Sequence, residues 1–163
     1  ATKDPKHAEA WYYLGLLRDE RGDAAGATTA FLRARDLDMA LPPPAWSLSR
    51  DDLHGVARRV VDGLDAVLGS YVRHADVFIS DVPGIELVAD GVDPRALLLF
   101  DGINLPDLPG VPCARIFFYQ RNLERLAGSE AAMEEELRAA LEREITLTFL
   151  ESDVGARSQK ELN

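Results

Sequence analysis

The spacing of hydrophobic residues in the first 40 positions predicts two antiparallel helices. Trp11 and Leu14 fall on one face of a first helix, and Gly15 beside them allows close approach of a second helix. We expect the turn at Gly22 and Asp23, because glycine commonly ends a helix and aspartate caps the start of the next one. In the second helix, apolar residues recur at helical spacing on the face expected to pack against the first helix. These residues are Ala27, Phe31 and Ala34.

This pattern resembles a tetratricopeptide repeat, in which small and large apolar residues at these offsets pack two helices together. Asp4-Pro5 matches the end of a preceding repeat, whereas Arg18 departs from the pattern, which usually has an aromatic residue there. A single repeat cannot bury its apolar face alone. The resemblance therefore implies either a longer array of repeats or a hairpin that packs on the following domain. One repeat offers too little groove for a peptide, so we assign no peptide site.

Proline and capping residues divide the chain into three parts. Pro42-Pro43-Pro44 excludes helix and favours a stiff extended segment, which Trp46 is expected to anchor. Ser49 fits the N-cap of the next helix. We expect a tetratricopeptide-like hairpin over residues 1–39, a proline-rich linker over 40–49 and a second domain over 50–163.

The second domain is predicted to be α+β. We expect an amphipathic helix over residues 51–72, buried strands at 77–79 and 114–120, and a short helix opened by Asp93 and Pro94. A short strand at 100–104, a turn-rich loop and a short helix at 121–127 complete the middle of the domain. A long helix over 130–150 has one apolar face: Met133, Leu137, Leu141, Ile145 and Phe149. This order favours a few-stranded sheet packed on helices.

Composition narrows the classes of function. The net charge of -10 disfavours nucleic acid and anionic membranes, and no apolar run is long enough to span a bilayer. The first residues lack the apolar core of a signal peptide, and a lone cysteine, Cys113, cannot form an internal disulfide. We interpret Cys113 as a core or loop residue. We therefore expect a cytoplasmic protein whose partner is another protein.

The stretch "RIFFYQRNLERL" followed by a long helix resembles the bacterial minimal-zincin metallopeptidase-like domain, over residues 53–163. In that family the helix carries His-Glu-x-x-His-x-x-Gly-x-x-Asp. The resemblance places Arg143 and Leu147 at the two ligand histidines and Leu150 at the glycine. Glu144 stands at the general base, and Asp153 at the third ligand.

These substitutions remove the metal chemistry that the resemblance would imply. A guanidinium has donors only and an isobutyl group has no ligand atom, so Arg143 and Leu147 cannot bind zinc. We predict no metal, no cofactor and no peptidase activity, with Arg143 paired to Glu144 or Asp153 and with Leu147 and Leu150 filling the old cleft. His7, His54 and His74 form no pair with metal-ligand spacing.

Three functions remain open. The first is a non-catalytic, zincin-like interaction module fused to tetratricopeptide repeats. The second is a residual hydrolase that uses Glu144 and Asp153, and the third is a purely structural element of a larger protein. The partner, the pathway, the oligomeric state and the presence of further repeats upstream are not readable from the sequence.

Overall fold

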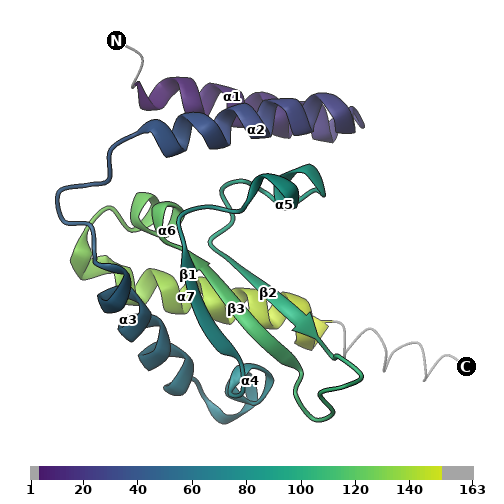
Figure 1. The fold of residues 1–163 in the computed structure, drawn as a ribbon, viewed down its shortest axis with the longest axis vertical. Helices are drawn as coiled ribbons and strands as arrows, with labels where there is room; N and C mark the ends of the chain where they lie inside the picture. The colour runs from purple at the N-terminus through teal and green to yellow at the C-terminus, as the bar shows by residue number, and fades with distance from the viewer. Residues whose placement is uncertain (1–3, 152–163) are drawn as a thin grey trace, which may run out of the picture.

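The structure, a computed structural model, describes residues 4–151 and has an α+β architecture (Figure 1). A helical hairpin comes first, and the helices and the three strands of the second domain are interspersed after it. In chain order the elements are α1 (Pro5–Glu20), α2 (Ala24–Ala40), α3 (Arg50–Asp62), α4 (Ala66–Val72), β1 (Asp76–Ser80), α5 (Ile85–Ala89), β2 (Leu98–Ile103), β3 (Cys113–Tyr119), α6 (Gln120–Ala127), the 3-10 turn η1 (Glu130–Ala132), α7 (Met133–Ile145) and the π-helical turn η2 (Thr146–Leu150).

The predicted helical hairpin is confirmed, with its turn at the expected place. Gly22 adopts a φ of 80°, and the Asp23 carboxylate accepts a hydrogen bond from the Gly26 amide at 2.9 Å to cap α2. A Cβ atom at Gly15 would lie 2.5 Å from the Phe31 ring, so only glycine permits this approach of the two helices. The close contact explains why the small residue and the aromatic ring occur at these two positions.

The hairpin packs on the following domain, which is one of the two arrangements left open by the sequence. Asp38 of α2 is 3% exposed, and its carboxylate lies 3.2 Å from the guanidinium of Arg95 and 3.4 Å from that of Arg125. Arg35 of α2 donates a hydrogen bond to the Pro83 carbonyl at 2.7 Å. The contacts between α2 and the second domain therefore include a buried ionic cluster.

The linker is held in place by a buried carboxylate of α6. Glu124 is 3% exposed and accepts hydrogen bonds from the Ser47 hydroxyl and the Leu48 amide, both at 2.9 Å. Gln120 of the same helix donates to the Leu48 carbonyl at 2.7 Å. Trp46 packs against the hydrophobic core, as the sequence predicted. The proline-rich segment is therefore a fixed part of the fold.

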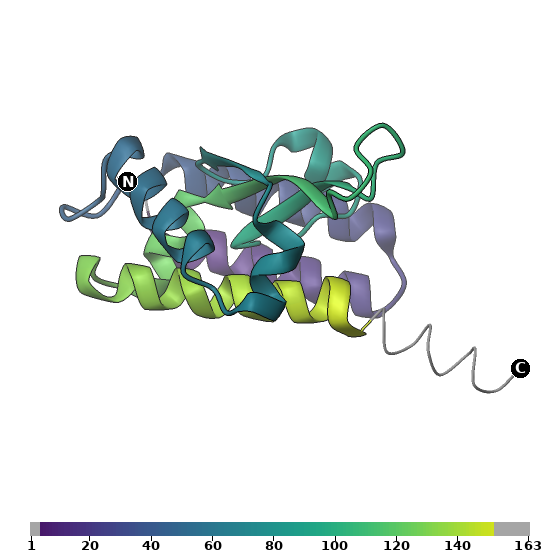
Figure 2. The ribbon, with the colours of Figure 1, turned by 90° about the horizontal axis from the view of Figure 1, so that it is seen from below.

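The sheet has the strand order β1-β3-β2, with β1 parallel and β2 antiparallel to β3. One face is buried, and α3 and α7 cover it (Figure 2). The strand residues on this inner face are Val77, Leu98, Ile116 and Phe118. The opposite face, called the outer face here, carries alternate residues of the same strands: Phe78, Ser80, Leu99, Asp101, Arg115, Phe117 and Tyr119.

Two predicted elements differ from the structure. The helix expected over 51–72 is broken into α3 and α4, because Gly63 caps the end of α3 and Asp65 caps the start of α4 through the Leu68 amide at 2.9 Å. The helix expected from Asp93 and Pro94 is a turn that leads into β2. The short helix α5 was not predicted.

The predicted C-terminal helix is confirmed as a continuous helical run from η1 through α7 to η2. All five residues predicted to line its apolar face are buried: Met133, Leu137, Leu141, Ile145 and Phe149. Phe149 stacks on Tyr71 with 4.9 Å between the ring centroids, which anchors the last described turn to α4. Between residues 4 and 151 no helix has the length and apolar character needed to cross a membrane.

Candidate functional site

The end of the C-terminal helix carries the positions that the sequence assigned to a lost metal site. Gly128, with a φ of 74°, ends α6, and the Ser129 hydroxyl accepts from the Ala132 amide to start the run that leads into α7. Arg143 and Glu144 lie in the last turn of α7, and Leu147 lies in the π-helical turn η2. Such π-helical turns are rare and often accompany functional sites.

The side chains at these positions do not form the closed ionic site that we expected. Arg143 is exposed and Glu144 is half-buried, and no ion pair joins them within the described part of the chain. Leu147 is 48% exposed, so it does not fill a cleft. The expected Arg143–Glu144 pair and the expected filling of the cleft by Leu147 are therefore wrong, whereas Leu150, the other leucine of the expected plug, is half-buried. Asp153 lies outside the described residues, as does any pairing that involves it.

No cluster of potential metal ligands occurs in residues 4–151, where three or more histidine, cysteine, aspartate or glutamate side chains nowhere converge. His7 and His74 are exposed. His54 is also exposed, with its Nε2 atom 3.1 Å from the Val77 carbonyl at the edge of the sheet. Cys113 is a buried core residue, and burial raises the pKa of its thiol, so it is not poised as a nucleophile.

Arg143 does line a cleft of about 580 Å³, together with two further arginines and one glutamate. Arg95 and Arg125 are both engaged by Asp38, and the Arg95 guanidinium also lies over the Tyr12 ring at 4.8 Å from its centroid. Burial, with the charges of the neighbouring arginines, lowers the pKa of Arg125, although Asp38 opposes this. The two arginines therefore hold the hairpin on the domain, and of the three arginines in the cleft only Arg143 has no ion pair with another described residue.

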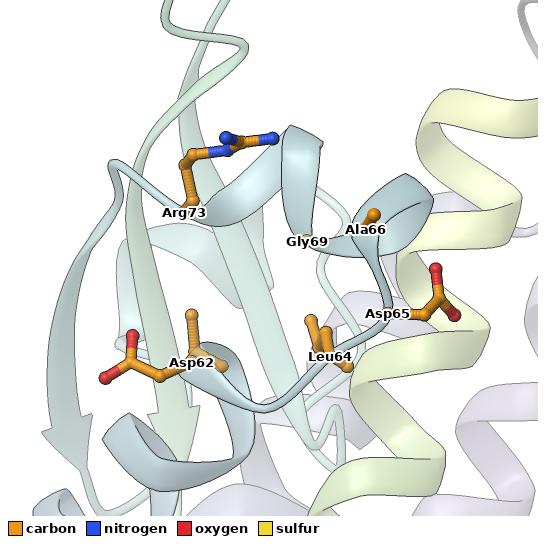
Figure 3. A pocket seen from close by; sticks show the side chains of 7 residues that line it. Asp62, Leu64, Asp65, Ala66, Gly69 and Arg73 are labelled. Atoms are coloured by element: carbon orange, nitrogen blue, oxygen red, sulfur yellow. The ribbon is translucent and has the colours of Figure 1, made fainter.

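A shallower hollow of about 300 Å³ lies between α3 and α4 (Figure 3). Its carboxylates already have structural partners. Asp62 is paired with Arg58 at 2.8 Å, a hydrogen bond that lowers the Asp62 pKa, and Asp65 caps α4. The Arg73 side chain points away from both carboxylates (Figure 3). This hollow therefore lacks converging groups for a ligand.

A third pocket, of about 370 Å³, lies between α5 and the outer face of the sheet. It is called the outer-face pocket here. Its walls combine apolar side chains with a few polar ones: Ser80, Val82, Gly84, Leu87, Leu99, Asp101, Phe117 and Tyr119. No pocket was predicted at this place from the sequence. The alternation of residues along the strands would have placed five of its residues on one face only if the strand register had been known.

Helix α1 presents large apolar side chains to solvent on the side away from α2. Tyr13, Leu16 and Leu17 are 59%, 39% and 42% exposed, at positions i, i+3 and i+4 of the helix. These three residues, called the α1 stripe here, therefore neighbour one another on one side of the helix. Glu9 and Glu20 flank the stripe at helical spacing and are exposed.

Comparison of the chain with protein-family models finds no matching family, and comparison with curated proteins finds no match. The structure alone defines the class: a small α+β domain with an N-terminal helical hairpin.

Proposed function

We propose that the chain is a non-catalytic protein-interaction module, built from a tetratricopeptide-like hairpin and a zincin-like domain that has lost its metal ligands. Its α1 stripe binds an amphipathic helix of a partner protein. The observation that carries this proposal is the exposure of Tyr13, Leu16 and Leu17 on a helix whose opposite side packs on α2.

The spacing of the stripe selects the shape of the partner. Exposed apolar residues at i, i+3 and i+4 form a compact patch on one side of a helix, which can pack against the apolar face of another helix. The hairpin is fixed to the second domain through Asp38, so α1 is a rigid surface that loses little conformational entropy on binding. An isolated apolar side chain would need no explanation, whereas three adjacent ones favour an interface.

Charge selects the chemistry of that helix. Glu9, Glu20 and Arg21 border the stripe, so this border has a net negative charge, as does the chain as a whole, with a net charge of -10. A partner helix with leucine-like anchors and flanking lysines or arginines is complementary to this border, and the attraction speeds its association. An acidic partner helix would be repelled.

The absence of catalysis is supported by the chemistry of the substituted positions. Arg143 and Leu147 offer no ligand atom, and Glu144 without a metal-bound water has no activated nucleophile to deprotonate. The fold of the domain does not depend on these positions, because the buried face of α7 is formed by other residues of the helix.

A direct test uses a photo-reactive amino acid at position 13 of the full chain, expressed in the source cell. We expect cross-links to a basic, amphipathic helix of one partner, and their loss when Leu17→Glu is added. The matched control carries the photo-reactive residue at position 126, because Leu126 is also exposed, at 53%, but lies on α6. Equal cross-linking from both positions, or no effect of Leu17→Glu, would reject the proposed surface.

A further inference from the structure

The outer-face pocket brings together residues that are distant in sequence, through the strand register alone. Ser80 pairs with Tyr119 between β1 and β3, and Leu99 pairs with Phe117 between β2 and β3. Side chains at paired positions point to the same face, so these four residues meet on the outer face. Leu87 of α5 lies across the pocket from the sheet.

The walls of the pocket are apolar and partly aromatic. Val82 is buried, and Leu87, Leu99 and Phe117 are half-buried. The Phe117 ring stacks on Phe78 of the neighbouring strand, with 5.1 Å between the centroids. Apolar pockets that contain a few placed polar groups are the usual form of small-molecule sites.

One polar group that lines the pocket, the Tyr119 hydroxyl, has no hydrogen-bond partner among residues 4–151. Tyr119 is 2% exposed as a residue, although the hydroxyl oxygen itself is not fully buried. Because the hydroxyl is not fully buried, it can bond to water or to a polar group of a compound that enters the pocket. Burial and the nearby Asp101 carboxylate raise the Tyr119 pKa, which keeps the phenol neutral and able to donate.

The charges in the pocket cancel. Asp101 carries the one carboxylate among the lining residues, and this carboxylate lies 2.6 Å from the guanidinium of Arg115 on the adjacent strand. A charged ligand, whether a cation or an anion, therefore gains little electrostatic binding energy in the pocket. The volume, about 370 Å³, lies at the small end of the range of about 300–1,000 Å³ that is usual for ligand pockets.

We propose that the outer-face pocket binds a small, uncharged aromatic compound, with its rings between Leu87 and Phe117 and one polar group hydrogen-bonded to the Tyr119 hydroxyl. A cavity of about 150 Å³ holds a single benzene ring, so the larger pocket fits a compound of about two rings. This site is separate from the α1 stripe, because it is formed by α5 and the sheet.

The test is a titration of the full chain with indole, an uncharged two-ring compound with one N–H group. Heteronuclear NMR follows the amide resonances. We expect saturable shifts at Leu99, Phe117 and Tyr119. The variant Leu87→Trp fills the pocket and should abolish these shifts, and Tyr119→Phe removes the hydrogen bond and should weaken binding about threefold to tenfold.

Tyr13→Phe provides the matched control, because it removes an exposed phenol of α1 and should leave indole binding unchanged. Circular dichroism establishes that each variant is folded. Absence of saturable shifts in the wild-type chain, or retained shifts in a folded Leu87→Trp variant, would overturn the site. If Leu87→Trp does not fold, Tyr119→Phe decides, since unchanged affinity in that variant contradicts the proposal.

Discussion

Asp38 is expected to be the ionic group that contributes most to holding the helical hairpin on the second domain. Its side chain is 1% exposed, and it faces two guanidiniums from different elements, at 3.2 Å and 3.4 Å. The substitution Asp38→Ala leaves both cations without their shared partner. Removing one partner of a buried ion pair costs about 3–5 kcal/mol.

The lower end of that range applies here. Arg95 and Arg125 side chains are 19% and 35% exposed, so water can solvate them in the variant, and Arg95 keeps the Tyr12 ring at 4.8 Å. We therefore expect a loss of about 3 kcal/mol in the free energy of unfolding. For a domain of this size the midpoint of thermal unfolding then falls by about 6–12 °C.

Urea unfolding followed by circular dichroism measures this loss. Asp36→Ala is the matched control, because Asp36 lies on the same helix, is 62% exposed and pairs with Arg35 at 3.6 Å. Its removal should change the free energy of unfolding by no more than about 0.5 kcal/mol. If both variants lose the same small amount, the buried cluster does not stabilise the hairpin against the domain.

Three further predictions concern the hairpin, the linker and alkaline pH. Gly15→Ala should lower stability by about 1–3 kcal/mol in thermal melts, because the added methyl group meets the Phe31 ring. Glu124→Ala should lose about 2 kcal/mol and expose the linker around Ser47 to proteases, since it removes buried charge-assisted hydrogen bonds. Burial raises the Tyr12 pKa, so its contribution to stability is complete below the unfolded value of about 10 and is lost as the pH rises further. Tyr12→Phe should therefore flatten the fall of stability between pH 9 and 11 in urea titrations.

Local sequence signals predicted the elements that rest on local chemistry. The hairpin turn, the Ser49 cap and the apolar face of α7 all follow from short-range spacing and capping, and each is present. Gly63 is a residue type that often ends a helix, and Asp65 is one that often starts the next. The helical spacing of apolar residues nevertheless continues through Leu64 and Leu68, so one continuous helix was predicted where the structure has α3 and α4.

The segment after Asp93 shows where local signals fail. Asp93 does accept a hydrogen bond from the Arg95 amide at 2.8 Å, as a helix start would. The chain nevertheless continues as strand β2, because Leu98 and Phe100 pair with Phe118 and Ile116 of β3. Pairing with a distant strand outweighs the local preference for helix.

The candidate sites depended on long-range contacts and could not be predicted. Asp38 meets Arg95 across 57 positions, and the Glu124 carboxylate meets the Ser47 hydroxyl across 77. The outer-face pocket needs the register of all three strands. By contrast, the residue types alone exclude zinc ligation by Arg143 and Leu147, because neither side chain has an atom that binds zinc.

Zinc binding by the full chain tests the central claim, that this protein acts by binding a partner without metal chemistry. The purified chain is dialysed against buffer that contains zinc, then against zinc-free buffer, and its metal content is measured beside that of a Glu144→Gln variant. We predict no retained zinc in either protein and no difference between them. Stoichiometric zinc in the wild-type chain that is lost in Glu144→Gln, together with hydrolysis of casein, would contradict the account and favour the residual hydrolase.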